Sequence, residues 1–129
     1  MKDITTEQNI EILVDTVFEA EFSKPDIPSF IFSYKISIYN HNPFPVQVLS
    51  REWLITDSCG ETTLVKGDGV VGLTPIIEAN GKFEYTSNVN LQSGIGRMKG
   101  FYKMKNKSTN KLFKASIKEF KLEAKFVMN

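Results

Sequence analysis

The stretch that decides the fold reads Phe30-Ile31-Phe32-Ser33-Tyr34-Lys35-Ile36-Ser37-Ile38. Large apolar side chains occupy every second position, and the positions between them include Ser33, Lys35 and Ser37. Successive side chains of a β-strand point to opposite faces of a sheet, so this alternation predicts a strand with one buried and one exposed face.

The same period of two recurs along most of the chain, and no segment has the apolar spacing of an amphipathic helix. Further strands are predicted in residues 10–22, 46–56, 61–66, 76–77, 83–91, 97–105, 111–118 and 120–126, with a loop in residues 23–29. The apolar phase slips within residues 46–56, which predicts a β-bulge near residues 48–50. Residues 57–60 predict a hairpin turn, and Asn80-Gly81 predicts another between the strands at 76–77 and 83–91. Seven or eight short strands separated by turns predict an all-β antiparallel sandwich.

Length and composition favour one soluble domain spanning residues 1–129. The 129 residues are 41% hydrophobic and 24% charged, which is typical of a globular domain. No apolar run reaches the roughly 18 to 20 residues of a spanning helix, so we expect no membrane partner. The first residues carry no apolar signal-peptide core, and the single cysteine suits a reducing compartment, so we expect a cytoplasmic location.

Charge is distributed unevenly along the chain. Residues 1–30 hold seven acidic and two basic residues, whereas residues 97–129 hold ten basic and two acidic ones. A basic surface that binds anions is one interpretation. We favour the alternative that the first and last strands lie side by side and pair their charges across one sheet. We do not expect nucleic acid among the partners.

Glycines are concentrated in Gly67-Asp68-Gly69-Val70-Val71-Gly72, which matches the spacing of a dinucleotide-binding motif. That motif requires a following helix, and here Thr74-Pro75-Ile76-Ile77 follows instead. In the favoured interpretation the glycines only shape a tight connection. In the alternative, backbone N–H groups of Gly67, Gly69 and Gly72 cradle a phosphate or pyrophosphate, with Lys66 and Arg97 supplying positive charge. Asp68 would repel such an anion unless Mg²⁺ bridged the two.

No catalytic constellation is evident elsewhere. His41 lies in a turn between two asparagines, and Cys59 lies beside Gly60 in a predicted turn. One histidine and one cysteine cannot form the usual zinc cluster, and the calcium-loop pattern is absent. We therefore predict no catalytic residues, no metal site and no cofactor. Arg51 stands out, because a charge on a central strand usually needs a partner.

Four blocks of the sequence resemble the bacterial ApaG family. They are residues 48–57 (VLSREWLITD), 67–75 (GDGVVGLTP), 83–87 (FEYTS) and 96–104 (GRMKGFYKM), in the family's order. The chain departs from the family pattern at Asn80-Gly81, where proline-glycine is usual, at Glu52, and in its more basic ending.

The resemblance implies a β-sandwich similar to immunoglobulin and fibronectin type III domains. It also implies an association with cobalt and magnesium tolerance and with genes for diadenosine polyphosphate breakdown. In larger eukaryotic proteins the family's domain resembles an interaction module, and no established catalytic residues carry over. We therefore expect a non-catalytic binding protein with a protein partner, and as the alternative a phosphate-containing small molecule held at residues 67–72.

Overall fold

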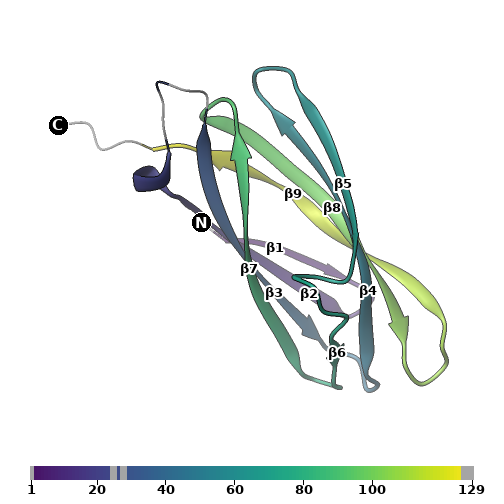
Figure 1. Ribbon diagram of the computed structural model, residues 1–129. Coiled ribbons are helices and arrows are strands. Elements are labelled where there is room, and N and C mark those ends of the chain that lie inside the picture. Colours follow the sequence, from purple (N-terminus) through teal and green to yellow (C-terminus); the bar gives the residue numbers. More distant parts are fainter. Residues whose placement is uncertain (1, 24–25, 27–28, 126–129) are drawn as a thin grey trace.

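The alternating segments form two antiparallel sheets that pack face to face in the computed structural model (Figure 1). The structure describes residues 2–23, 26 and 29–125. One sheet has the strand order β1-β2-β3-β7, and the other has the order β5-β4-β8-β9, with β6 paired to β4. The first sheet is formed by β1 (Lys2–Glu7), β2 (Ile10–Phe18), β3 (Phe30–Asn40) and β7 (Lys82–Leu91). The second is formed by β4 (Val46–Asp57), β5 (Thr62–Asp68), β6 (Ile76–Ile77), β8 (Ile95–Asn106) and β9 (Leu112–Glu123). The predicted fold class is confirmed.

The core lies between the sheets, where the apolar positions of each strand meet. Phe32, Ile36 and Ile38 of β3 are fully buried, as the alternation predicted. Trp53 of β4 packs across the interface against Tyr34, with ring centroids 5.7 Å apart. It also contacts Phe120 of β9 at 5.9 Å, edge to face. Such aromatic pairs add to the burial that holds the sheets together.

Two β-bulges explain the phase slips of the apolar pattern. The first lies between Val48 and Ser50 of β4, as predicted. The second lies in the pairing of β8 with β9, where Met98 is opposite Phe120 but Gly100 is opposite Ile117. The extra residue shifts the buried positions of β9 by one, so the two strands predicted at 111–118 and 120–126 are one strand, β9. Residue 126 lies outside the described residues.

Three predictions about local structure were wrong. The alternation in residues 10–22 ends at Phe18, and a 3₁₀ turn, η1 (Ala20–Phe22), follows. The strand β1 was missed, because residues 2–7 have no clear apolar alternation. Asn80 and Gly81 do form a turn, in which the Gly81 N–H donates to the Glu78 carbonyl. This turn crosses between the sheets rather than closing a hairpin, since β6 pairs with β4 and β7 with β3. The predicted loop at 23–29 lies partly outside the described residues.

The predicted pairing of charges between the first and last strands across one sheet was also wrong. The first predicted strand corresponds to β2, which belongs to a different sheet from β9, although the two strands are in contact where the sheets meet. Within the described residues, no helix is long and apolar enough to cross a membrane.

Candidate functional site

The glycine-rich segment begins on a strand rather than in a loop. Gly67 and Asp68 are the last residues of the edge strand β5, paired with Arg51 and Ser50 of β4. The chain then makes a tight turn closed by the bridge between Val70 and Leu73. The predicted connection is therefore shorter than residues 67–73.

Gly67 and Gly69 each lie close to another part of the chain, and at Gly69 that neighbour is backbone. A Cβ atom at Gly67 would lie 2.6 Å from Nη1 of Arg51, so the missing side chain makes room for the guanidinium group. A Cβ atom at Gly69 would lie 1.9 Å from the Leu73 carbonyl oxygen, and Gly69 also has a positive φ of 59°.

The Arg51 side chain is hydrogen-bonded to the backbone of the glycine-rich segment. Its Nη1 donates to the carbonyl oxygens of Asp68 at 3.2 Å and Gly69 at 3.0 Å. The expected partner of the Arg51 charge is thus a pair of backbone carbonyls and not a carboxylate. On the neighbouring strand β8, the cross-strand partner of Arg51 is the buried Tyr102.

Most N–H groups of the segment donate within the chain. The Gly69 N–H donates to Leu49 at 2.7 Å, at the β4 bulge. Val70 and Leu73 donate to each other's carbonyls, at 2.7 and 2.9 Å. In the turn after Gly69, this leaves at most the N–H groups of Val71 and Gly72 for an anion. Few donors therefore remain for an anion-binding nest, which depends on consecutive N–H groups.

The predicted cationic residues do not converge on the glycine segment. Lys66 projects from the outer face of β5, where its Nζ lies 3.4 Å from the Glu52 carboxylate. Arg97 is paired with Thr56 near the opposite end of β4, and its Nε lies 3.5 Å from Glu119. Sequence reasoning missed Lys103, which joins Lys66 and Asp68 in lining an open groove, because the pairing of β8 with β4 cannot be read from the sequence.

Val71 adopts a conformation that is unusual for its residue type. Val71 and Gly72 have positive φ angles of 43° and 78°, the dihedral signature of a type I′ turn. Among the described residues with positive φ, Val71 alone is β-branched. This conformation costs a β-branched residue roughly 1–3 kcal/mol. The side chain is nevertheless 53% exposed, so core packing does not account for it.

Exposed apolar side chains continue beyond Val71, at Leu73 and Ile76. The segment is fixed to β4, since the Val48 N–H donates to the Pro75 carbonyl at 3.0 Å. The turn at residues 70–73 thus presents apolar side chains, and backbone hydrogen bonds to β4 fix the chain both before and after it.

A second cavity lies at another end of the sandwich. This cleft of about 1050 Å³ has Phe18, Phe32 and Phe120 among its lining residues, and Arg97 also lines it. The charge of Arg97 is already countered by Glu119. Arg97 therefore lines this cleft and not the glycine segment.

The remaining reactive side chains have structural partners. His41 is exposed, bonds Glu11 at 2.9 Å and stacks on Tyr39. Asp57 accepts hydrogen bonds from the Ser93 hydroxyl and the Gln92 N–H, both at 2.5 Å. Burial raises the pKa of Asp57, but these hydrogen bonds together hold it below its ordinary value. The carboxylate thereby ties two turns together. Among the described residues, no group of three or more His, Cys, Asp and Glu side chains could hold a metal ion.

Comparison with known proteins identifies the family. The profile of the ApaG domain matches residues 20–106. The chain belongs to the ApaG family. Protein ApaG of Vibrio vulnificus is 40% identical over 124 residues, which cover 96% of this chain and 98% of that protein. Protein ApaG of Pseudomonas aeruginosa is 39% identical over 117 residues, covering 91% and 92%.

A solved structure has the same fold. The crystal structure of a Bordetella pertussis protein described as ApaA has a TM-score of 0.84 at 34% identity, covering 95% of this chain and 94% of that one. The four ApaG sequence blocks noted above now have places in the fold. The block at 67–75 forms the end of β5 and the strained turn, and the block at 48–57 supplies the bulge and the arginine that hold it.

Proposed function

We propose that this chain is a non-catalytic binding domain of the ApaG type that contacts a partner protein through the turn at residues 70–73. The observation that carries the proposal is the strained, exposed Val71. Strained residues that the surrounding structure holds in place occur preferentially at functional sites. Here Arg51 and the β4 bulge hold the turn, and the strain presents an apolar side chain to solvent.

The proposal includes a role in Co²⁺ or Mg²⁺ homeostasis that is exerted through this partner protein. The absence of a metal-ligand cluster among the described residues supports an indirect route. A cytoplasmic location is part of the same proposal, since Cys59 is an exposed free thiol, which suits a reducing compartment.

Site-specific photo-crosslinking tests the proposal. A photo-crosslinking amino acid placed at Leu73 in cells is expected to trap a discrete partner, and the same amino acid at Val17 of β2 is not. These two positions have similar exposure, 55% and 53%. Excess unlabelled wild-type protein should abolish the crosslink, whereas an equally folded Val71→Asp competitor should not. Equal products at both positions, or equal competition by the variant, would refute the proposal.

The alternative function is binding of a phosphate or pyrophosphate group beside Gly67, Asp68, Gly69 and Gly72. The presence of Lys66 and Lys103 in the lining of the groove beside Asp68 favours it, whereas the ion pair of Lys66 with Glu52 and the scarcity of free N–H groups oppose it. Calorimetric titration of ATP and a diadenosine polyphosphate, with and without Mg²⁺, decides between the two. We expect no heat at millimolar ligand. Mg²⁺-dependent heat that becomes Mg²⁺-independent in Asp68→Asn would establish the alternative.

A further inference from the structure

The outer face of β8 and β9 carries charge of nearly one sign. On β8 the inward positions hold Met98, Tyr102 and Met104, which are buried. The basic face, as we call it, consists of the outward basic residues of these two strands other than Lys118, which lies in the β9 bulge: Arg97, Lys99, Lys103, Lys105, Lys114 and Lys121.

Like charges lie directly opposite each other on this face. Lys103 of β8 is paired with Lys114 of β9, and Arg97 is paired with Lys121. Facing like charges destabilise an antiparallel pair of strands. Within the described residues, no carboxylate lies within ion-pair distance of Lys103, Lys114 or Lys121. This arrangement of like charges therefore lowers the stability of the folded state.

Protection of a sheet edge does not explain these lysines. Lysine on an edge strand blocks unwanted pairing with other chains, and β9 is such an edge. Strand β8, however, lies between β4 and β9, where both of its sides are already hydrogen-bonded. Its lysines need another explanation.

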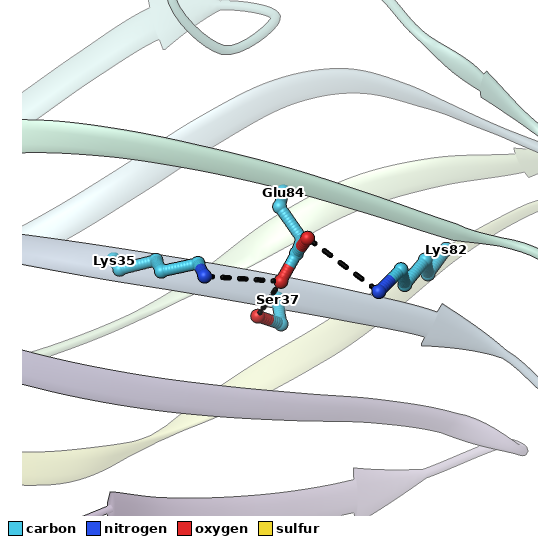
Figure 2. Close-up of polar contacts among 4 residues, drawn as sticks. All are labelled: Lys35, Ser37, Lys82 and Glu84. Atoms are coloured by element: carbon cyan, nitrogen blue, oxygen red, sulfur yellow. Dashed lines mark hydrogen bonds and ion pairs between the residues drawn. The ribbon is translucent and has the colours of Figure 1, made fainter.

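On the outer face of the other sheet, by contrast, lysines are paired with an acidic residue. Glu84 of β7 lies 3.4 Å from Lys35 and 3.6 Å from Lys82, and it accepts a hydrogen bond from Ser37 (Figure 2). The hydrogen bond from Ser37, together with the charge of Lys35, lowers the pKa of Glu84. Lys35 and Lys82 thus have an acidic partner, whereas no ion pair joins a lysine of the basic face to a carboxylate of the described residues.

We propose that the basic face binds an extended acidic polypeptide segment. Outward residues of β8 recur every second position, about 6.8 Å apart, and an extended peptide repeats its side chains at the same interval. Carboxylates at alternate positions of such a peptide match Lys99, Lys103 and Lys105. Lysines outnumber arginines five to one on this face, and the flexible ammonium group adapts to carboxylates in varied positions.

The single aromatic side chain that the described part of this face offers argues against single-stranded nucleic acid. Proteins that bind such strands stack bases on exposed aromatic rings. The Phe101 ring is occupied, because Nζ of Lys114 lies 4.4 Å from its centroid.

Fluorescence anisotropy with a labelled peptide of alternating glutamate and serine tests the proposal. The double variant Lys99→Glu/Lys103→Glu is expected to weaken binding at least tenfold. The control Lys35→Glu/Lys82→Glu makes the same change in net charge on the opposite sheet and should change affinity less than threefold. Equal losses in both variants, or no binding by the wild type at low salt, would overturn the proposal. So would tighter binding of a single-stranded oligonucleotide of equal charge that is lost in the same variant.

Thermal unfolding supplies a second, independent readout. Lys103→Glu converts the facing pair with Lys114 into opposite charges, so its Tm should rise above that of the wild type. A lower Tm would overturn the argument that this face is kept at the expense of stability. The turn at residues 70–73 is unchanged in these variants, so failure here is distinguishable from failure of the proposed turn contact.

Discussion

Val71→Asn should stabilise this protein, although it removes an apolar side chain. Val71 occupies the first central position of a type I′ turn, with φ at 43°, and Gly72 follows it. Asparagine tolerates this left-handed conformation, and Asn-Gly is among the most favoured pairs for the turn. The substitution therefore replaces a strained residue by one suited to the backbone.

The magnitude follows from two opposing effects. Relief of the left-handed strain contributes roughly 1–3 kcal/mol. Full burial of a valine side chain is worth at least about 1.5 kcal/mol, and Val71 is 53% exposed, so removing it costs about 0.7 kcal/mol. The net expectation is a gain of about 1 kcal/mol, which corresponds to a rise in Tm of about 3–5 °C for a domain of this size.

Differential scanning calorimetry or thermal unfolding by circular dichroism measures the change. Val17→Asn is the matched control, because Val17 is also 53% exposed but lies on β2. Asparagine is unfavourable in a strand, so this control should lower the Tm. A Tm for Val71→Asn that falls as far as that of the control would refute the claim of strain at Val71.

Three further predictions concern the framework of the site. Gly69→Ala should destabilise the fold by about 3 kcal/mol or more, measured by urea unfolding, because its Cβ would lie 1.9 Å from the Leu73 carbonyl oxygen. Asp57→Asn should lower the free energy of unfolding by ~1–2 kcal/mol at neutral pH, and it should reduce the dependence of that free energy on pH in the acidic range. Since the pKa of Asp57 is lowered on folding, its contribution is complete above about pH 4 and is lost as the pH falls through the folded pKa. Tyr85→Phe should lower the free energy of unfolding by ~1–3 kcal/mol in the same assay, because it leaves the buried Tyr102 hydroxyl without its hydrogen-bond partner. The double variant Tyr85→Phe/Tyr102→Phe should cost less than the sum of the two single variants.

Each of these predictions can fail in a distinct way. Gly60→Ala is the control for Gly69→Ala, since Gly60 also has a positive φ but nothing lies near its missing Cβ. Equal losses at both glycines would show that close contact with Leu73 is unimportant. An unchanged acid limb in Asp57→Asn would contradict the assigned pKa shift, and additive losses at the two tyrosines would contradict their mutual hydrogen bond.

The fold was predictable where side-chain alternation and burial coincide. Residues 30–38 show the alternation because β3 is an interior strand with one face on the core. The β4 bulge was equally predictable, since an extra residue shifts the apolar phase. The turn at Asn80-Gly81 was predicted as a turn but not as a crossover between sheets. Local turn chemistry fixes the backbone of a few residues and carries no information about which sheet receives the next strand.

The site was less predictable, because its features depend on contacts between distant strands. Nothing in the sequence indicates a left-handed Val71, since the usual signal for a type I′ turn is asparagine or aspartate before glycine. The role of Gly67 depends on the position of the Arg51 guanidinium group on a neighbouring strand. The alternation of lysines in residues 97–105 was visible in the sequence. That no carboxylate of the described residues pairs with these lysines became evident only once β8 was placed between β4 and β9.

The two proposed contact regions share a physical criterion that separates them from the glycine pattern. Gly67 and Gly69 are explained by the chain's own packing, so their spacing carries no independent evidence for a ligand. Val71 and the facing pair Lys103 and Lys114 are the opposite case, because each works against the stability of the fold that contains it. Residues that break a local rule at a cost in stability are expected at functional sites. For both regions, the decisive result is therefore a substitution that raises stability and weakens binding at the same position. A substitution that raises stability without affecting binding would remove the reason to assign a function to that region.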